Sequence, residues 1–169
     1  MPKQASSQAG KREQKTDALA LLKADHKEVK ELFKSYDELV AAEADDDEKG
    51  AIATRICFML TVHATIEEEI FYPAARENID EQDILDEAEV EHASAKDLIA
   101  QIEAMTPGEY LFDAKVKVLG EYVAHHVTEE EEELFPKVKA AKPDLQALGD
   151  ELAARKQELM AEADAEQAT

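Results

Sequence analysis

The sequence predicts an all-α protein, an antiparallel up-down four-helix bundle with an extra C-terminal helix. Glycine and proline are scarce, with 5 of each in 169 residues, and charged residues make up 35% of the chain. Such a composition is typical of helical proteins. From position 18 onward, apolar residues recur at steps of three and four, which is the helical period. Four long runs of this kind are joined by loops too short for a crossover connection.

The first two helices are predicted from apolar runs with clear boundaries. The first run begins after Thr16-Asp17, which can cap a helix, and stops in the acidic stretch 44–50. Pro73 is expected to break or kink the second run, because proline disturbs a helix interior. The two runs consist of Leu22, His26, Val29, Phe33, Tyr36 and Val40, and of Ile52, Ile56, Met59, His63, Glu67 and Ile70.

The third and fourth helices follow polar turns. Asp80 is the expected N-cap of the third helix. Thr106, Pro107 and Glu109 suit the N-cap, the first helical position and the capping box of the fourth, which ends at Pro136. The two runs consist of Ile84 or Leu85, Ala88, His92, Ala95, Ile99 and Ile102, and of Phe112, Val116, Leu119, Val123, His126, Glu130 and Leu134.

The chain is expected to form one domain with two appended segments. Residues 1–16 are polar and predicted to be a disordered tail, and residues 17–140 form the bundle. Residues 141–169 are predicted to be a further helix that opens at Pro143-Asp144 and frays after Met160. Its apolar stripe is thin, so we expect it to pack on the outside of the bundle or against a protein partner.

The charge and cysteine content exclude several classes of function. There are 40 acidic and 19 basic residues, which gives a net charge of −21. Such a surface repels phosphate backbones and anionic lipids, so we expect no nucleic-acid or membrane binding. It favours solubility, and the alternative reading is that it attracts cations. No signal peptide or membrane span is expected, and the single Cys57 suggests a reducing, cytoplasmic location.

Six polar side chains lie inside the apolar runs. Four of the five histidines occupy such positions, one per helix, and two glutamates each follow a histidine by four residues on the same helix face. One histidine on an apolar face is usually a core residue. A carboxylate there is costly unless it is paired or bound to metal. The candidate metal ligands are His26, His63, Glu67, His92, His126 and Glu130.

The spacing places the four histidines at one level of the bundle. In an antiparallel hairpin, two residues lie level when the turn is midway between them. The midpoints between successive histidines fall at the acidic stretch 44–50, within residues 77–80 and beside the Thr-Pro-Gly turn. All three are turns predicted independently, so the histidines should converge with both glutamates one helical turn away.

The two halves of the chain repeat this pattern. His63-x-x-x-Glu67 and His126-x-x-x-Glu130 are each followed by an aromatic residue and proline, with the proline ten residues after the histidine. This register selects His126 over its neighbour His125, which should face outward. Imidazole with carboxylate and no thiolate fits iron, manganese or zinc. Six such ligands exceed one tetrahedral zinc site but suit two ions bridged by glutamate.

The ordered set of motifs resembles the hemerythrin-like (HHE cation-binding) family over roughly residues 17–140. The set consists of Asp25-His26, His63-x-x-x-Glu67, Glu91-His92 and His126-x-x-x-Glu130. The resemblance implies an up-down bundle that holds a non-haem di-iron centre with an oxo or hydroxo bridge. The ligands it implies are the six residues above, with both glutamates bridging.

One position departs from the oxygen-carrying members of that family. They carry a second histidine four residues after the third-helix histidine, and here that residue is Lys96. One iron would lack a nitrogen ligand, which argues against reversible dioxygen carriage. Members with this sparser pattern are similar to proteins linked to peroxide, nitric oxide or iron handling. Glu133 is a candidate for an extra ligand, and its alternative is a solvated position in the acidic run.

Three functional hypotheses follow from the sequence. The first is a di-iron protein that binds or reduces oxygen, peroxide or nitric oxide. The second is a non-catalytic iron-binding or sensing module read out through the C-terminal helix. The third is a purely structural acidic bundle. We see no nucleophile, general base or phosphate-binding loop that would support hydrolysis.

Overall fold

The computed structural model describes residues 16–168, and the expected N-terminal tail lies, apart from Thr16, outside the described residues. Within them the chain is helical and has no strand, which confirms the predicted fold class. The elements are α1 (Ala18–Ala41), α2 (Asp46–Ile66), η1 (Glu67–Phe71), α3 (Tyr72–Asn78), α4 (Gln82–Glu103), α5 (Phe112–Glu129), η2 (Glu130–Leu134), α6 (Phe135–Ala140) and α7 (Leu145–Gln167).

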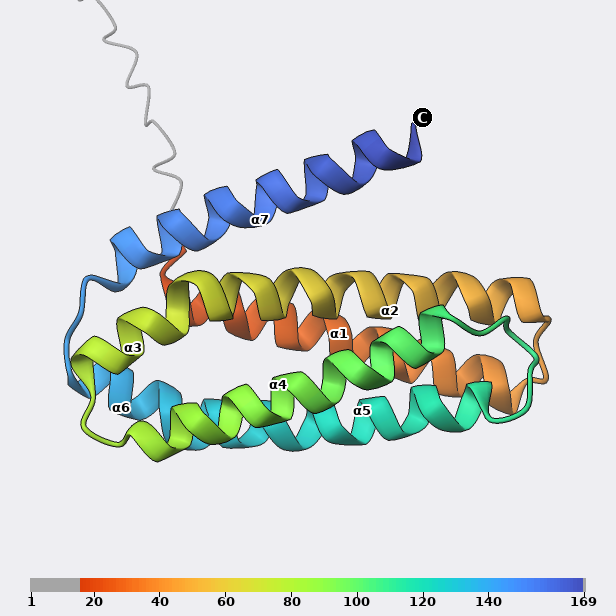
Figure 1. Cartoon of the computed structure of the whole chain (residues 1–169), viewed down its shortest axis with the longest axis horizontal. Coiled ribbons are helices and arrows are strands. Elements are labelled where there is room, and N and C mark those ends of the chain that lie inside the picture. The colour runs from red at the N-terminus through yellow and green to blue at the C-terminus, as the bar shows by residue number, and fades with distance from the viewer. Residues whose placement is uncertain (1–15, 169) are drawn as a thin grey trace, which may run out of the picture.

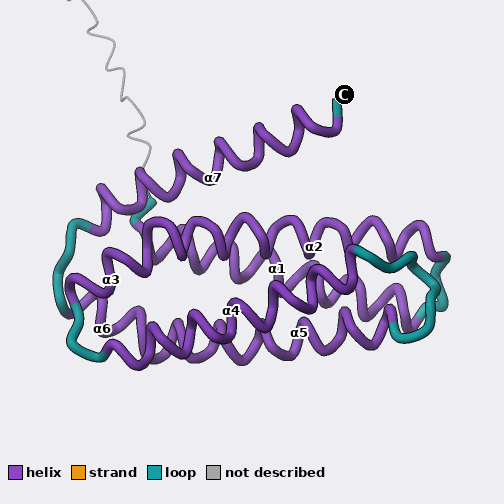
Figure 2. The backbone as a smooth tube through the Cα atoms, in the orientation of Figure 1, coloured by secondary structure: helices purple, strands orange, loops and turns teal. Residues whose placement is uncertain are grey.

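Four long rods form the bundle, and each runs antiparallel to its neighbours (Figure 1). Helix α1 packs against α2 and α5, and α4 packs against α5 and α2, so consecutive rods are neighbours. The second rod continues from α2 through η1 into α3, and the fourth continues from α5 through η2 into α6 (Figure 2). Short loops at the two ends complete the up-down bundle.

The first two helix starts use aspartate caps. The Asp17 carboxylate accepts a hydrogen bond from the N–H of Ala20 at 2.9 Å, as predicted, and Asp45 accepts one from Glu48 at 2.9 Å. The acidic stretch 44–50 differs from the expected loop, because most of it forms the start of α2. Three acidic residues in this first turn face the positive end of the helix dipole, which stabilises them there.

The starts of α4 and α5 lie later than predicted. Asp80 is not a cap, since α4 begins at Gln82 with no side-chain cap. Glu109 does accept a hydrogen bond from the N–H of Thr106, as in a capping box. The chain then makes a further turn through Leu111, whose φ of 72° is left-handed and interrupts a helix. Helix α5 therefore begins at Phe112.

The second α-helix is interrupted just before Pro73, in line with the expected break or kink, and the rod continues beyond it, whereas Pro136 does not end the fourth rod, contrary to expectation. A π-helical segment precedes each proline, and the N–H of Tyr72 donates to the carbonyl of Glu67, five residues back. The N–H of Phe135 donates in the same way to Glu130. Each proline is then the second residue of a new α-helical segment, where its missing N–H is tolerated.

The apolar core is divided into two clusters. One lies near the end of the bundle that contains α3, α6 and the start of α1, and includes Leu22, Ile66 and Phe71. The other lies toward the opposite end and includes Tyr36, Ile56 and Leu119. The six candidate ligands occupy the positions between them on every rod. The polar layer is therefore enclosed by apolar packing on both sides.

Helix α7 crosses the outside of the bundle, as expected, and contacts α1, α2 and η1. Leu148 and Leu152 are buried in the first core cluster. A Cβ at Gly149 would lie 2.7 Å from the carbonyl oxygen of Thr16, so this position requires glycine for close approach. The helix continues to Gln167 instead of fraying after Met160. Figure 1 shows its C-terminal half diverging from α2.

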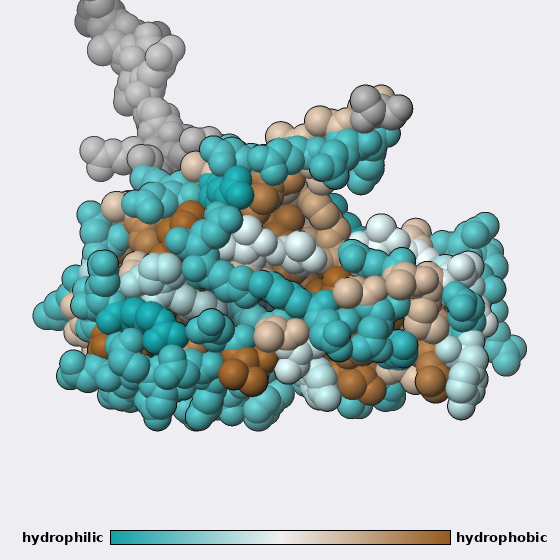
Figure 3. Space-filling view, viewed as in Figure 1, coloured by the Kyte–Doolittle hydropathy of each residue, from teal (hydrophilic) through white to brown (hydrophobic). Residues whose placement is uncertain are grey.

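The surface agrees with the acidic composition. Hydrophilic residues cover most of the face in Figure 3, and apolar atoms gather beneath α7 where it leaves the bundle. Among residues 16–168, no helix is both long and apolar enough to cross a bilayer.

Candidate metal centre

The structure brings the six predicted side chains together in the middle of the bundle. Each rod contributes a histidine, and the two π-helical segments contribute the glutamates. Five of the six are buried, and the side chain of His126 is 13% exposed. Glu67 has no exposed surface. The residues are His26, His63, Glu67, His92, His126 and Glu130.

The two glutamates occupy equivalent places in the repeat. Glu67 is the first residue of η1, and Glu130 is the first residue of η2. A π turn rotates the helix relative to an α turn, and such segments are frequent at functional sites. The same local device therefore directs both carboxylates into the bundle.

One donor group contains His26, His63 and both glutamates. The Nε2 atoms of His26 and His63 are 3.1 Å apart, and Nε2 of His63 lies 2.7 Å from Oε1 of Glu67. Nε2 of His26 lies 3.8 Å from Oε1 of Glu130. Adjacent donors of an octahedral ion with bonds of about 2.1 Å are separated by about 3 Å. The spacing of these donors fits a shared cation.

A second donor group contains Glu67, His92 and His126. The Nε2 atoms of the two histidines are 3.1 Å apart, and Oε2 of Glu67 lies 3.1 Å from Nε2 of His92. Oε2 of Glu130 lies 2.9 Å from Nε2 of His126. Each glutamate thus presents Oε1 to the first group and Oε2 to the second.

The hydroxyl of Tyr72 also lies in the second group. It is 2.9 Å from Oε2 of Glu67 and 3.0 Å from Oε2 of Glu130, to which it donates. It is also 3.1 Å from Nε2 of His92 and 3.3 Å from Nε2 of His126. An oxygen so close to four other candidate ligand atoms can itself act as a metal ligand.

The unsatisfied polar atoms test whether a cation fits. Oε1 of Glu67 and Oε1 of Glu130 are buried without a hydrogen-bond partner, although Nε2 of His63 lies 2.7 Å from the former. Buried carboxylate oxygens normally have partners. Here the Oε1 atoms of both glutamates face histidine Nε2 atoms at the centre of the cluster. The residues therefore fit a bound cation.

A carboxylate faces the outer ring nitrogen of every histidine in the cluster. Nδ1 of His63 is 3.0 Å from Asp25, Nδ1 of His92 is 2.9 Å from Glu68, and Nδ1 of His126 is 2.5 Å from Glu91. Nδ1 of His26 is 3.5 Å from Glu131 and makes no hydrogen bond. Such partners fix the orientation of metal-binding histidines and direct Nε2 toward the ion.

Two of these four outer carboxylates accept hydrogen bonds from lysines. Nζ of Lys156, on α7, donates to Oδ1 of Asp25 at 2.5 Å, and Nζ of Lys96 donates to Oε2 of Glu68 at 2.5 Å. Asp25 is buried, whereas Lys96 is exposed at the surface. The C-terminal helix is thereby linked to His63 through a single aspartate.

The pKa values reflect an excess of negative charge. Burial raises the pKa of Glu130, and the neighbouring charge of Glu67 raises it further. Burial and the same two carboxylates raise the pKa of Tyr72. Burial lowers the pKa of His63, but Glu67 and Asp25 outweigh it and raise this pKa to about 10. A cation at the centre would relieve this concentration of charge.

The remaining candidates from the sequence lie elsewhere. The side chain of His125 is 68% exposed and 3.1 Å from Glu129, as its outward position predicted. Glu133 is exposed and belongs to neither central donor group. Cys57 is buried, and burial raises its pKa to about 12, so its thiol is unreactive.

Sequence reasoning missed Tyr72 and assigned no role to the outer carboxylates. Tyr72 lies in the aromatic-proline part of the repeat, five residues after Glu67. Each outer carboxylate is adjacent in sequence to a candidate ligand but faces a histidine on a neighbouring rod. That cross-helix pairing depends on helix rotation, which spacing along one helix does not determine.

Comparison with known proteins is consistent with this geometry. The chain matches the hemerythrin HHE cation-binding domain over residues 17–138. It superimposes with a TM-score of 0.74 on a crystal structure of a hemerythrin HHE cation-binding domain-containing protein from Mycobacterium kansasii. The two are 23% identical, and the match covers 90% of this chain and 93% of that one. This likeness shows a shared fold.

A second relative is much longer. A protein named DNA nickase, from Nostoc sp. (strain PCC 7120 / SAG 25.82 / UTEX 2576), is 38% identical over 80 residues. The match covers 47% of this chain but 22% of that protein, so its named activity belongs to a protein of which this chain matches a small part. The family match, by contrast, spans the whole bundle and its His/Glu clusters. The chain belongs to the hemerythrin HHE cation-binding domain family.

Proposed function

We propose that this chain is a non-haem di-iron protein that binds or reacts with a small oxidant: oxygen, peroxide or nitric oxide. The observation that carries the proposal is the pair of donor groups that share Glu67. Each group has two histidines, and the two oxygens of Glu67 are divided between them. Imidazole and carboxylate donors suit iron, and manganese and zinc fit the same ligands.

In this proposal His26 and His63 hold one iron, and His92 and His126 hold the other. Glu67 and Glu130 would be shared by the pair, an oxo or hydroxo group would complete the centre, and Tyr72 would be a further ligand on the His92 side. The iron pair supplies the redox chemistry when it is bound. The protein supplies the ligands, their orientation and the exclusion of water.

The surrounding residues have defined tasks. Asp25, Glu68 and Glu91 each accept a hydrogen bond from a histidine Nδ1, so that Nε2 keeps its lone pair for the metal. The two core clusters enclose the polar layer and keep bulk water from the bridging carboxylates. Tyr72 holds a proton between Glu67 and Glu130 when no cation is present.

An iron-dependent sensing role is the alternative, and a specific contact favours it. Lys156 of α7 donates to Asp25, which accepts from His63. A change at the metal could therefore alter the docking of α7, and a protein partner could bind the part of α7 that extends past the bundle. We expect a cytoplasmic location and neither nucleic-acid nor membrane partners, from the single cysteine and the net charge of −21.

Peroxide turnover separates the two roles. The iron-loaded protein should consume hydrogen peroxide in the steady state faster than free iron at equal concentration. Turnover equal to that of free iron would favour the sensor. The structural hypothesis requires metal-free protein after growth in iron-replete medium, so metal analysis tests it separately. In the metal analysis His125→Ala serves as a control and should retain its iron, because His125 belongs to neither central donor group.

A further inference from the structure

A cavity opens directly onto the donor cluster on the side of the second core cluster. Its volume is about 300 Å³, and all four histidines of the cluster line it. A water molecule occupies about 30 Å³ of liquid, and pockets for organic ligands begin at about 300 Å³. The space is therefore about ten times the volume of one water molecule and exceeds what a diatomic oxidant or hydrogen peroxide requires.

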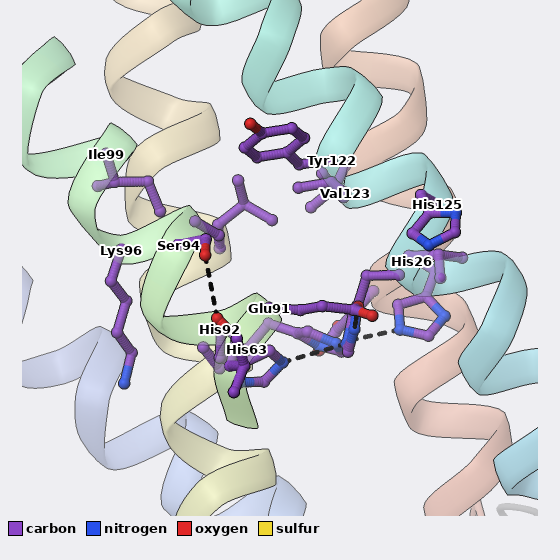
Figure 4. Close-up of a pocket in the computed structure, with 18 residues that line it drawn as sticks. His26, His63, Glu91, His92, Ser94, Lys96, Ile99, Tyr122, Val123 and His125 are labelled. Carbon is purple, nitrogen blue, oxygen red and sulfur yellow. Dashed lines mark hydrogen bonds and ion pairs between the residues drawn. The ribbon is translucent and has the colours of Figure 1, made fainter. Parts of the chain in front are cut away.

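The walls of the cavity are apolar and come from all four rods. Val29, Leu60, Ala95, Ile99 and Val123 line it between α1, α2, α4 and α5. In Figure 4, Ile99, Tyr122 and Val123 lie across the space from His63 and His92. Tyr122 is 52% exposed and Val90 is 67% exposed, so both lie at the mouth of the cavity. An entering molecule would meet aliphatic side chains first and the metal ligands last.

The charges that face the cavity favour a neutral occupant. Asp25 and Glu91 line it, and both carboxylates are already engaged with histidines. Lys96 also lines the cavity, and its ammonium group donates a hydrogen bond to Glu68. An organic anion would lose its hydration beside two carboxylates and would be repelled by the net charge of −21. A neutral molecule with an apolar body avoids that cost.

We propose that this cavity binds a neutral organic molecule with one oxygen-bearing end directed at the histidines, and that organic hydroperoxides are its substrate class. The inference deepens the proposed function and rests on it for the reaction, although the binding stands on the cavity alone. In the reaction the O–O bond breaks, and ROOH with two electrons and two protons gives ROH and water. The two electrons would come from a ferrous pair held by the two donor groups, which would be oxidised to the ferric state.

Binding is tested with 2-phenyl-2-propanol, the alcohol formed from cumene hydroperoxide. Titration calorimetry of the iron-loaded, oxidised full chain should give a Kd of about 1 mM or tighter. Ala95→Phe fills the cavity and should weaken this binding at least about tenfold. Ala100→Phe makes the same change at an exposed position of α4 and should stay within about twofold of wild type.

Folding of the variants is checked by helical circular dichroism and iron content. If Ala95→Phe does not fold, the smaller Ala95→Leu replaces it and should weaken binding in the same direction. Absence of binding to the wild type, or equal binding by the filled variant and Ala100→Phe, would overturn the inference.

The substrate class is tested by oxidation of the ferrous protein under anaerobic conditions. Cumene hydroperoxide should oxidise the iron, and its rate constant relative to that of hydrogen peroxide should fall at least about tenfold in Ala95→Phe. An unchanged ratio would overturn the inference. If neither peroxide oxidises the iron while the alcohol binds, the proposed function fails and the binding site stands.

Discussion

Tyr72 and Phe135 occupy the same position of the two repeats, yet they break the symmetry of the metal centre. Tyr72 follows Glu67 by five residues, and Phe135 follows Glu130 by five. The Tyr72 hydroxyl lies 3.1 Å from Nε2 of His92. The Phe135 ring instead stacks on His26, with ring centroids 5.9 Å apart and planes 6° apart. One donor group therefore gains an oxygen, and the other gains an apolar cover.

Tyr72→Phe should alter one half of the centre. A cation next to a phenol favours its deprotonated form, so the ferric protein should show visible phenolate-to-iron absorption. The variant should lose this absorption and bind its more weakly held metal about 10- to 100-fold less tightly. Tyr122→Phe is the matched control, because Tyr122 lies at the cavity mouth. Identical spectra for wild type and Tyr72→Phe would show that the phenol is not a ligand.

Glu67→Gln should remove the bridge between the two donor groups. An amide cannot supply two anionic oxygens, so iron content should fall by about half or more, and the rise in Tm caused by metal should shrink. Inductively coupled plasma analysis and thermal melts measure both effects. Glu133→Gln removes the same charge from an exposed position and should keep its iron. A Glu67→Gln protein with wild-type iron and Tm would contradict a bridging role.

Metal uptake should release protons. Burial lowers the pKa values of His63 and His126, but hydrogen bonds and charges from neighbouring carboxylates raise them to about 10 and about 9. Both are therefore protonated in the metal-free protein at pH 7, and a cation must displace about two protons. Calorimetry in buffers of different ionisation enthalpy counts them.

The same pKa shifts determine how metal affinity and the stability of the metal-free protein change with pH. Metal affinity should increase between pH 6.5 and pH 9, because protons compete for the ligands. The stability that these histidines give the metal-free protein is complete below their unfolded pKa of about 6.5 and is lost as pH rises through 9 to 10. Metal affinity that is independent of pH in this interval would contradict the protonated cluster.

Lys156→Met should weaken the link between α7 and the centre. Oδ2 of Asp25 would keep its bond to His63, but Oδ1 would lose the ammonium group of Lys156. A buried acceptor left without its partner costs about 1–3 kcal/mol of folding free energy. Denaturant unfolding of the metal-loaded protein measures the loss. Lys137→Met is the control, since it breaks an ion pair with exposed Glu81, and surface ion pairs contribute little to stability. Equal effects of the two changes would show that the link to His63 is unimportant.

The chain should not bind duplex DNA at 0.15 M salt. The net charge of −21 opposes it, although four lysines form a local basic strip on one face of α1. Fluorescence anisotropy with a labelled duplex should show no binding at about 10 μM protein. Binding that disappears when the strip is changed to alanine would contradict the prediction and identify the surface responsible. The strip consists of Lys23, Lys27, Lys30 and Lys34.

The helical period and the placement of polar residues within it predicted the bundle and the convergence of six side chains. His126 was distinguished from His125 because the repeat fixes the register, and the exposed side chain of His125 agrees. The cost of burying Glu67 and Glu130 made those positions informative. These features depend on spacing along one helix, which a sequence displays directly.

Features that depend on backbone geometry were not predictable in the same way. The π-helical segment before Pro73 was not expected, because such a segment has no simple sequence pattern. Tyr72 was missed, since its hydroxyl reaches the centre only after that π turn. The cavity is lined by side chains of α1, α2, α4 and α5, so its size is a tertiary property.

The most direct test is the iron content of the purified chain, measured together with its near-ultraviolet spectrum after growth in iron-replete medium. The account predicts two irons per chain and the absorption of an oxo-bridged ferric pair. A chain that contains no iron, or one iron without that absorption, would contradict it.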